Sequence, residues 1–209
     1  MNTQQKIDEL RVRFKSARAE LEAEVERVLE SKRERFKYTL KQGKAVFDRE
    51  FKRLQRRERV SSFAYVLNAP ISFWLSAPVI YGMIVPLVFL VATITLYQHI
   101  CFRVYSIPRV MRSDYFIFDR HRLPYLNTVQ KINCVYCGYA NGLIAYAREI
   151  LARTEQFWCP VKHALRLQTA HEREIKFFDY GDAEAWKKDL KTVRHDWEDS
   201  DNKFRQQKD

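Results

Sequence analysis

Apolar residues recur at steps of three and four along residues 1–59. This spacing is typical of the a/d seam of a coiled coil, so it predicts a long amphipathic helix over 1–59. Two interpretations of its apolar stripe stay open: association with a second copy or a protein partner through residues 7–54, or a helix lying on anionic lipid. The positions concerned are Ile7, Leu10, Phe14, Ala17, Leu21, Val25, Val28, Phe36, Leu40, Phe47, Phe51 and Leu54.

The next stretch, residues 60–102, holds 43 residues without an Asp, Glu, Lys or Arg, although 30% of the chain is charged. About 20 uninterrupted apolar residues suit a helix that crosses a bilayer, so we expect a membrane segment at 60–104. Helix-breaking residues crowd its first half, and residues 87–102 have none. We favour a helical hairpin that turns near Pro78 to Pro86, with arms short enough to be re-entrant. The alternative is a single span at about 79–102.

Charge decides between these topologies. The formal net charge is +11, and basic residues outnumber acidic ones on both sides of the apolar run. Cytoplasmic flanks of membrane segments carry an excess of Lys and Arg, which predicts an inner (cytoplasmic) membrane protein with both termini cytoplasmic. The hairpin satisfies this condition. The same charge could suit nucleic acid, but no nucleic-acid-binding motif accompanies it, so anionic membrane lipid is the expected partner and nucleic acid is not.

Helical periodicity resumes after Leu123, and Asp182 is a candidate N-cap for a last helix. The predicted fold class is therefore mainly α, in three parts. These are the long N-terminal helix at 1–59, the membrane hairpin or single span at 60–104, and a small helical cytoplasmic domain at 105–209 that contains a cluster of cysteines and a histidine.

That cluster has the spacing Cys134-x2-Cys137 and Cys159-x3-His163. Four such ligands are what a tetrahedral zinc site needs, and Pro160 could begin a helix that carries Cys159 and His163 on one face. Both pairs can meet only if the helix between them is short. Zinc is the expected metal. An iron or iron–sulfur site, a Cys-x-x-Cys thiol pair placed ahead of a helix N-terminus, and inert packed cysteines stay open as alternatives.

Other catalytic signatures do not occur in the sequence. It has no phosphate-binding Gly-rich loop, no nucleophile elbow, no His-Glu-x-x-His motif, and five glycines in all. The sequence therefore favours a non-catalytic scaffold or interaction protein whose cytoplasmic domain is stabilised by metal. A membrane-tethered redox protein is the alternative.

Several stretches resemble a family of uncharacterised bacterial membrane proteins. They are CVYCGYANG and EQFWCPVKHA around the cysteines, NAPISFW and SAPVIYG in the apolar run, and FFDYGDAEAW downstream. The resemblance covers roughly residues 67 to 187. It implies membrane residence but no activity, substrate or cofactor.

Overall fold

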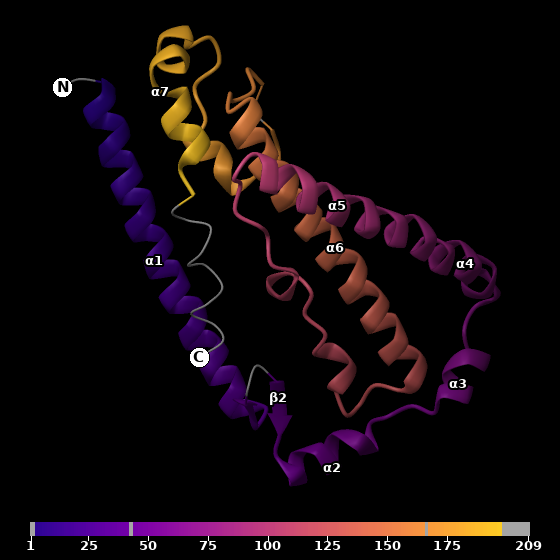
Figure 1. The fold of residues 1–209 in the computed structure, drawn as a ribbon. Helices are drawn as coiled ribbons and strands as arrows, with labels where there is room; N and C mark the ends of the chain where they lie inside the picture. Colours follow the sequence, from indigo (N-terminus) through magenta and orange to yellow (C-terminus); the bar gives the residue numbers. More distant parts are fainter. Residues whose placement is uncertain (1–2, 42–43, 166, 198–209) are drawn as a thin grey trace. The chain divides into compact units, whose positions relative to one another are not determined.

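The structure is a computed structural model that describes residues 3–41, 44–165 and 167–197. The chain divides into two compact units, Met1–Arg59 and Val60–Asp209. Helices make up most of both units, which confirms the mainly α fold class (Figure 1).

The first unit contains α1 (Thr3–Arg35), β1 (Tyr38–Lys41), β2 (Lys44–Phe47) and α2 (Arg49–Arg57). The prediction of one helix over 1–59 is therefore wrong, because a two-stranded antiparallel hairpin interrupts it. Lys37 ends the first helix with a positive φ of 47°, a conformation that an α-helix cannot continue.

The hairpin also explains why the spacing of apolar residues wrongly predicted a continuous helix here. Tyr38 and Phe47 lie opposite each other across the strands, with ring centroids 5.5 Å apart. Aromatic cross-strand pairs stabilise such a ladder. Two positions of the apparent seam, Leu40 and Phe47, therefore belong to a sheet. Asp48 then starts α2 by accepting hydrogen bonds from the backbone N–H groups of Glu50 and Phe51.

The second unit begins with α3 (Ser62–Leu67), α4 (Ile71–Gly82) and α5 (Ile84–Val104). Met83 joins α4 to α5 with helical angles, φ −60° and ψ −13°, so the chain does not reverse there. The predicted turn at Pro78 to Pro86 is wrong. Pro78 lies inside α4. Pro86 lies in the first turn of α5, where a backbone N–H would have no carbonyl partner within the helix, so proline removes no helical hydrogen bond there. Together α4 and α5 measure about 51 Å at 1.5 Å per residue.

A connector, residues 105–127, leaves the end of α5 and runs back beside the next helix to the start of that helix (Figure 1). It is irregular apart from two short 3-10 turns, η1 (Arg112–Asp114) and η2 (Arg120–Arg122). Ser106 begins it with a positive φ of 54°, which redirects the chain after α5. Asn127 ends it as the N-cap of the next helix, in a reciprocal capping box with Gln130.

That helix, α6 (Thr128–Trp158), runs parallel to α5 because the connector has carried the chain back. Near its start, the Tyr136 hydroxyl donates to the Ile80 carbonyl at 2.6 Å. Near its end, the hydroxyls of Thr154 and Tyr97 lie 2.9 Å apart. The two helices therefore accompany each other over the whole of α5.

The core lies between α5, the connector and α6. Gln98 is 3% exposed; its Oε1 accepts from the Val110 backbone N–H at 2.7 Å, and its Nε2 donates to the Tyr146 hydroxyl at 3.0 Å. Gly142 lets the connector approach α6, since a Cβ there would lie 2.7 Å from the Tyr115 carbonyl oxygen. The buried apolar residues of this core include Leu87, Ile94, Phe102, Ile107, Val110, Leu143, Tyr146 and Ile150.

The last part of the unit packs on the second half of α6. It contains η3 (Glu172–Lys176) and α7 (Ala183–His195), and the side chain of Asp182 accepts from the Ala185 N–H as the predicted N-cap. Beneath η3, the Glu149 Oε1 accepts from the Nε atoms of Arg153 at 2.8 Å and Arg173 at 2.9 Å. Both arginines are more than nine-tenths buried, so one carboxylate holds two buried cations.

Candidate functional site

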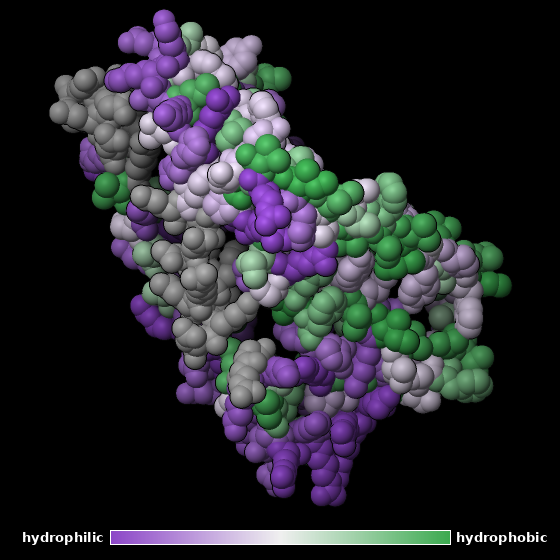
Figure 2. All heavy atoms as spheres, in the orientation of Figure 1, coloured by the Kyte–Doolittle hydropathy of each residue, from purple (hydrophilic) through white to green (hydrophobic). Residues whose placement is uncertain are grey.

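The most exposed apolar surface of the second unit belongs to α4. None of its side chains is buried, and Ile71, Leu75 and Val79 are 78%, 74% and 73% exposed. Figure 2 shows hydrophobic residues gathered where α4 and α5 lie. Contiguous exposed apolar surface of this kind marks a contact with a membrane or a partner.

On α5 the exposed apolar residues are confined to one face. They recur at steps of three and four, which is the period of one side of a helix. The opposite side packs against α6 and the connector through Leu87, Ile94 and Phe102. The exposed stripe consists of Val85, Val88, Phe89, Leu96, Ile100 and Val104.

Taken together, Ile71–Val104 is the one helical stretch among the described residues that is long and apolar enough to cross a membrane. The most apolar 18 consecutive residues of this stretch are not buried inside the protein. The coarse prediction of an apolar membrane-type helix agrees with this finding.

Cationic side chains of the connector accompany the second half of α5. The Arg109 guanidinium donates to Nε2 of His99, and the Arg112 guanidinium donates to the Thr95 hydroxyl. Nδ1 of His99 lies 2.8 Å from the Thr95 carbonyl oxygen. One edge of α5 is therefore polar and basic, although its sequence contains no charge before Arg103.

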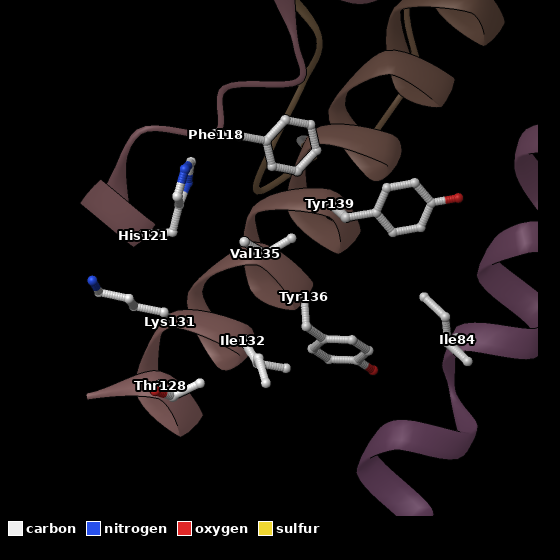
Figure 3. Close-up of a pocket in the computed structure, with 9 residues that line it drawn as sticks. All are labelled: Ile84, Phe118, His121, Thr128, Lys131, Ile132, Val135, Tyr136 and Tyr139. Atoms are coloured by element: carbon white, nitrogen blue, oxygen red, sulfur yellow. The ribbon is translucent and has the colours of Figure 1, made fainter. Parts of the chain in front are cut away.

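A groove of about 530 Å³ opens between the start of α5, the connector and the first half of α6 (Figure 3). This volume lies within the range of small-molecule sites. Lys131 and His121 lie at one side of it, and His121 Nδ1 is buried with no hydrogen-bond partner among the described residues. The sequence gave no signal that would pair His121 with Lys131. The groove is lined by Ile84, Phe118, His121, Thr128, Lys131, Ile132, Val135, Tyr136 and Tyr139.

The first cysteine pair lies within α6. Cys134 and Cys137 occupy its second and third turns, one half-buried and the other exposed, and both are free thiols. The expectation that they precede a helix N-terminus is wrong, because α6 already begins at Thr128. Both cysteines therefore lie beyond the first turn of α6, where the helix dipole acts most strongly.

The second pair does not lie on a helix. Cys159 is the C-cap of α6, and the backbone N–H of Phe178 donates to the Pro160 carbonyl in a short bridge beside Val161. The predicted helix starting at Pro160 is therefore wrong, and Cys159 and His163 do not share a helix face. Burial, and then the nearby Glu155 carboxylate, raise the pKa of the Cys159 thiol.

The two pairs also lie far apart. Residues 138–158 continue as one helix, which separates Cys137 from Cys159 by about 33 Å at 1.5 Å per residue. Within the described parts of the chain, no three His, Cys, Asp or Glu residues gather closely enough to hold a metal ion. The structure thus gives no support to a single-chain site built from Cys134, Cys137, Cys159 and His163, and zinc or iron binding stays a prediction.

Comparison of the chain with protein-family models, with curated proteins and with solved structures gave no match. The resemblance to uncharacterised bacterial membrane proteins consequently stays a prediction, and the exposed surfaces of the protein are the evidence that bears on its function.

Proposed function

We propose that this is a membrane-bound, non-catalytic interaction protein of the bacterial inner membrane. Its second unit is the anchor, through Ile71–Val104, and its first unit is available to a partner. The observation that supports this proposal most directly is α4, in which no side chain is buried and all residues except Ala77 are exposed. In lipid, this surface would be removed from water at about 25 cal/mol per Å².

The first unit supplies the interaction part of the proposal. Its helix α1 exposes Leu10, Phe14, Leu21, Val25 and Val28, each of them between 44% and 65%. These residues follow the spacing of an association seam, which favours a second copy of the chain or a helical partner through residues 7–54. Its net positive charge also suits anionic lipid, which is the competing occupant of the same surface.

A second candidate function is redox or metal chemistry at the cysteines. It is supported by Cys134 and Cys137, two free thiols at i and i+3 on one helix. A zinc or iron ion bound by Cys134 and Cys137 would need further ligands from residues that do not lie beside this pair in the described parts of the chain. Elemental analysis of the anaerobically purified protein tests it, with Cys134→Ser as the control. About one metal per chain that is lost in the variant would favour this candidate over the non-catalytic one.

Membrane fractionation tests the principal proposal. The variant Ile71→Lys/Leu75→Lys changes two side chains that contact solvent in the structure, so the fold should persist. Each lysine costs about 2.5–3.5 kcal/mol in a hydrocarbon environment, and we expect the variant to leave the membrane fraction after carbonate extraction. Tyr180→Lys is the matched control, since Tyr180 is an exposed large side chain outside the apolar stretch. Equal retention of both variants would contradict the proposal.

A further inference from the structure

We infer that the second unit is monotopic: α3, α4 and the exposed stripe of α5 enter one anionic leaflet, and the chain returns to the same side without crossing. This inference rests on the proposed membrane anchoring and specifies its geometry. It differs from both topologies that the sequence suggested, since the reversal lies at Asn68 to Pro70 and not at Pro78 to Pro86.

The first argument is the connector. It is irregular, its residues 109–112 contact the second half of α5, and its backbone groups would need partners if lipid surrounded it. Its charged side chains are mostly exposed, and exposed charges are expelled from hydrocarbon. The edge of α5 beside the connector must therefore stay at the level of headgroups and water. The charged residues are Arg109, Arg112, Asp114, Asp119, Arg120 and Arg122.

The second argument is length. Tyr136 and Tyr139 of α6 line the same groove as Ile84, and the Tyr81 hydroxyl donates to Oδ1 of Asn133, so polar groups of α6 lie beside the helix by the level of Ile84. Only residues 71–83 precede this level. Thirteen helical residues extend about 20 Å, which is less than the roughly 30 Å of a bilayer core. The part of the helix that is free of polar neighbours is too short to cross.

The third argument is the position of α3. The backbone N–H of Thr128 donates to the Ser62 hydroxyl at 3.2 Å, which fixes the start of α3 at the start of α6. Tyr136 fixes Ile80 of α4 to the same end of α6. The segment between these two anchors must therefore extend outward and return, as the corner between α3 and α4 does in Figure 1. Phe63 and Leu67 on this corner are 72% and 62% exposed.

The fourth argument is charge. Exposed arginines flank the apolar stripe of α5, with Arg103 beside Val104 at its end and Arg109 and Arg112 along its edge. An apolar face bordered by basic residues is the pattern of a helix that lies in the plane of an anionic membrane surface. This arrangement also leaves both basic flanks of residues 60–102 on the same side.

Protease accessibility of the full chain in inverted inner-membrane vesicles and in spheroplasts tests the inference, with an epitope tag at each end. We expect carbonate-resistant membrane association and both tags cleaved only in the inverted vesicles. Tags cleaved from opposite sides in a membrane-bound protein would overturn the monotopic geometry and leave the anchoring proposal intact. Recovery of the chain in the soluble fraction would overturn both.

A charge at the corner provides a second test. We expect Asn68→Lys to weaken binding of the purified protein to vesicles containing one-third phosphatidylglycerol at least tenfold, because the corner lies within the leaflet. The control Ser113→Lys adds the same charge on the exposed connector and should bind as well as wild type or better. In a crossing geometry the corner would reach the far surface, and unchanged binding of Asn68→Lys would overturn the inference.

Discussion

Helices α1 and α6 have nearly the same length, 33 and 31 residues, but they are stabilised in different ways. Among the side chains that the structure describes in α1, none is buried. In α6, nine residues are buried, including Leu143, Tyr146 and Ile150. Helix length alone therefore does not reveal whether a helix belongs to a core.

Ion pairs on its surface support α1. Arg18 pairs with Glu22 at 2.8 Å, and Arg33 pairs with Glu26 and Glu30 at 2.7 and 2.6 Å. Hydrogen bonding to the two carboxylates raises the pKa of Arg33. Exposed pairs of this kind contribute about 0.3–0.5 kcal/mol each, so they stabilise α1 far less than the burial of its side chains stabilises α6.

Removal of a carboxylate should produce the largest difference between the two helices. Glu149→Ala in α6 leaves Arg153 and Arg173 buried without their anion, and we expect a loss of about 3–5 kcal/mol in the free energy of unfolding. Glu22→Ala in α1 removes an exposed pair and should cost less than about 1 kcal/mol. Denaturant unfolding in mild detergent measures both, and equal effects would contradict the comparison.

Added volume should produce the next largest effect. Gly142→Ala places a Cβ 2.7 Å from the Tyr115 carbonyl oxygen, so the connector must move, and we expect a destabilisation of about 1–3 kcal/mol. The matched control is Gly138→Ala, whose Cβ would lie 3.4 Å from the Ile117 carbonyl oxygen. There the better helix propensity of alanine, worth up to about 1 kcal/mol, should offset the tighter contact. Thermal unfolding of the two variants should separate them, and a similar loss in both would show that the connector does not pack closely on α6.

A smaller effect is expected in α1. Val25→Asp/Val28→Asp changes two exposed side chains, so helicity measured by circular dichroism should hardly change. If the stripe is an association surface, the dissociation constant for self-association should rise at least tenfold, about 1.4 kcal/mol. Sedimentation equilibrium of the detergent-solubilised protein measures this, and Glu24→Asp controls for a conservative change on the same helix. Unchanged self-association would show that these exposed residues of α1 are not an association surface. Contact with lipid, or no role, would then remain for them.

The smallest effect concerns the end of α6. Because burial raises the pKa of Cys159, its reactive thiolate form appears at a higher pH in the folded protein than in the unfolded chain. We therefore expect alkylation of Cys159 by iodoacetamide near pH 8 to be slower in the native protein than in guanidinium. Mass spectrometry of the labelled peptide follows the rate. Faster alkylation in the native state would favour an activated thiol.

Local patterns in the sequence predicted what depends on local chemistry. The apolar helix follows from an uncharged run, and the start of α7 follows from Asp182. The β-hairpin was missed because Leu40 and Phe47 also fit the spacing of a helix. The parallel course of α5 and α6 depends on contacts distant in sequence, such as Gln98 with Val110 and Tyr146, which no periodicity reveals.

The cysteine spacing failed as a structural guide for a related reason. Ligand spacing is informative only if the residues between the pairs fold back, and here 138–158 continue as a helix. Gly138 and Gly142 do not bend this helix; they make room for the connector. The groove with Lys131 and His121 could not be foreseen either, because it needs the connector to return beside α6.

The parallel arrangement of α5 and α6 has a consequence for the order of synthesis. When α5 leaves the ribosome, Leu87, Ile94 and Phe102 have no cover, because α6 is not complete until Trp158. At about 5–20 residues per second, the interval is roughly 3 to 10 s. During this time the nascent chain presents a helix that is apolar on both faces, and only the finished protein restricts the exposed apolar surface of α5 to one face.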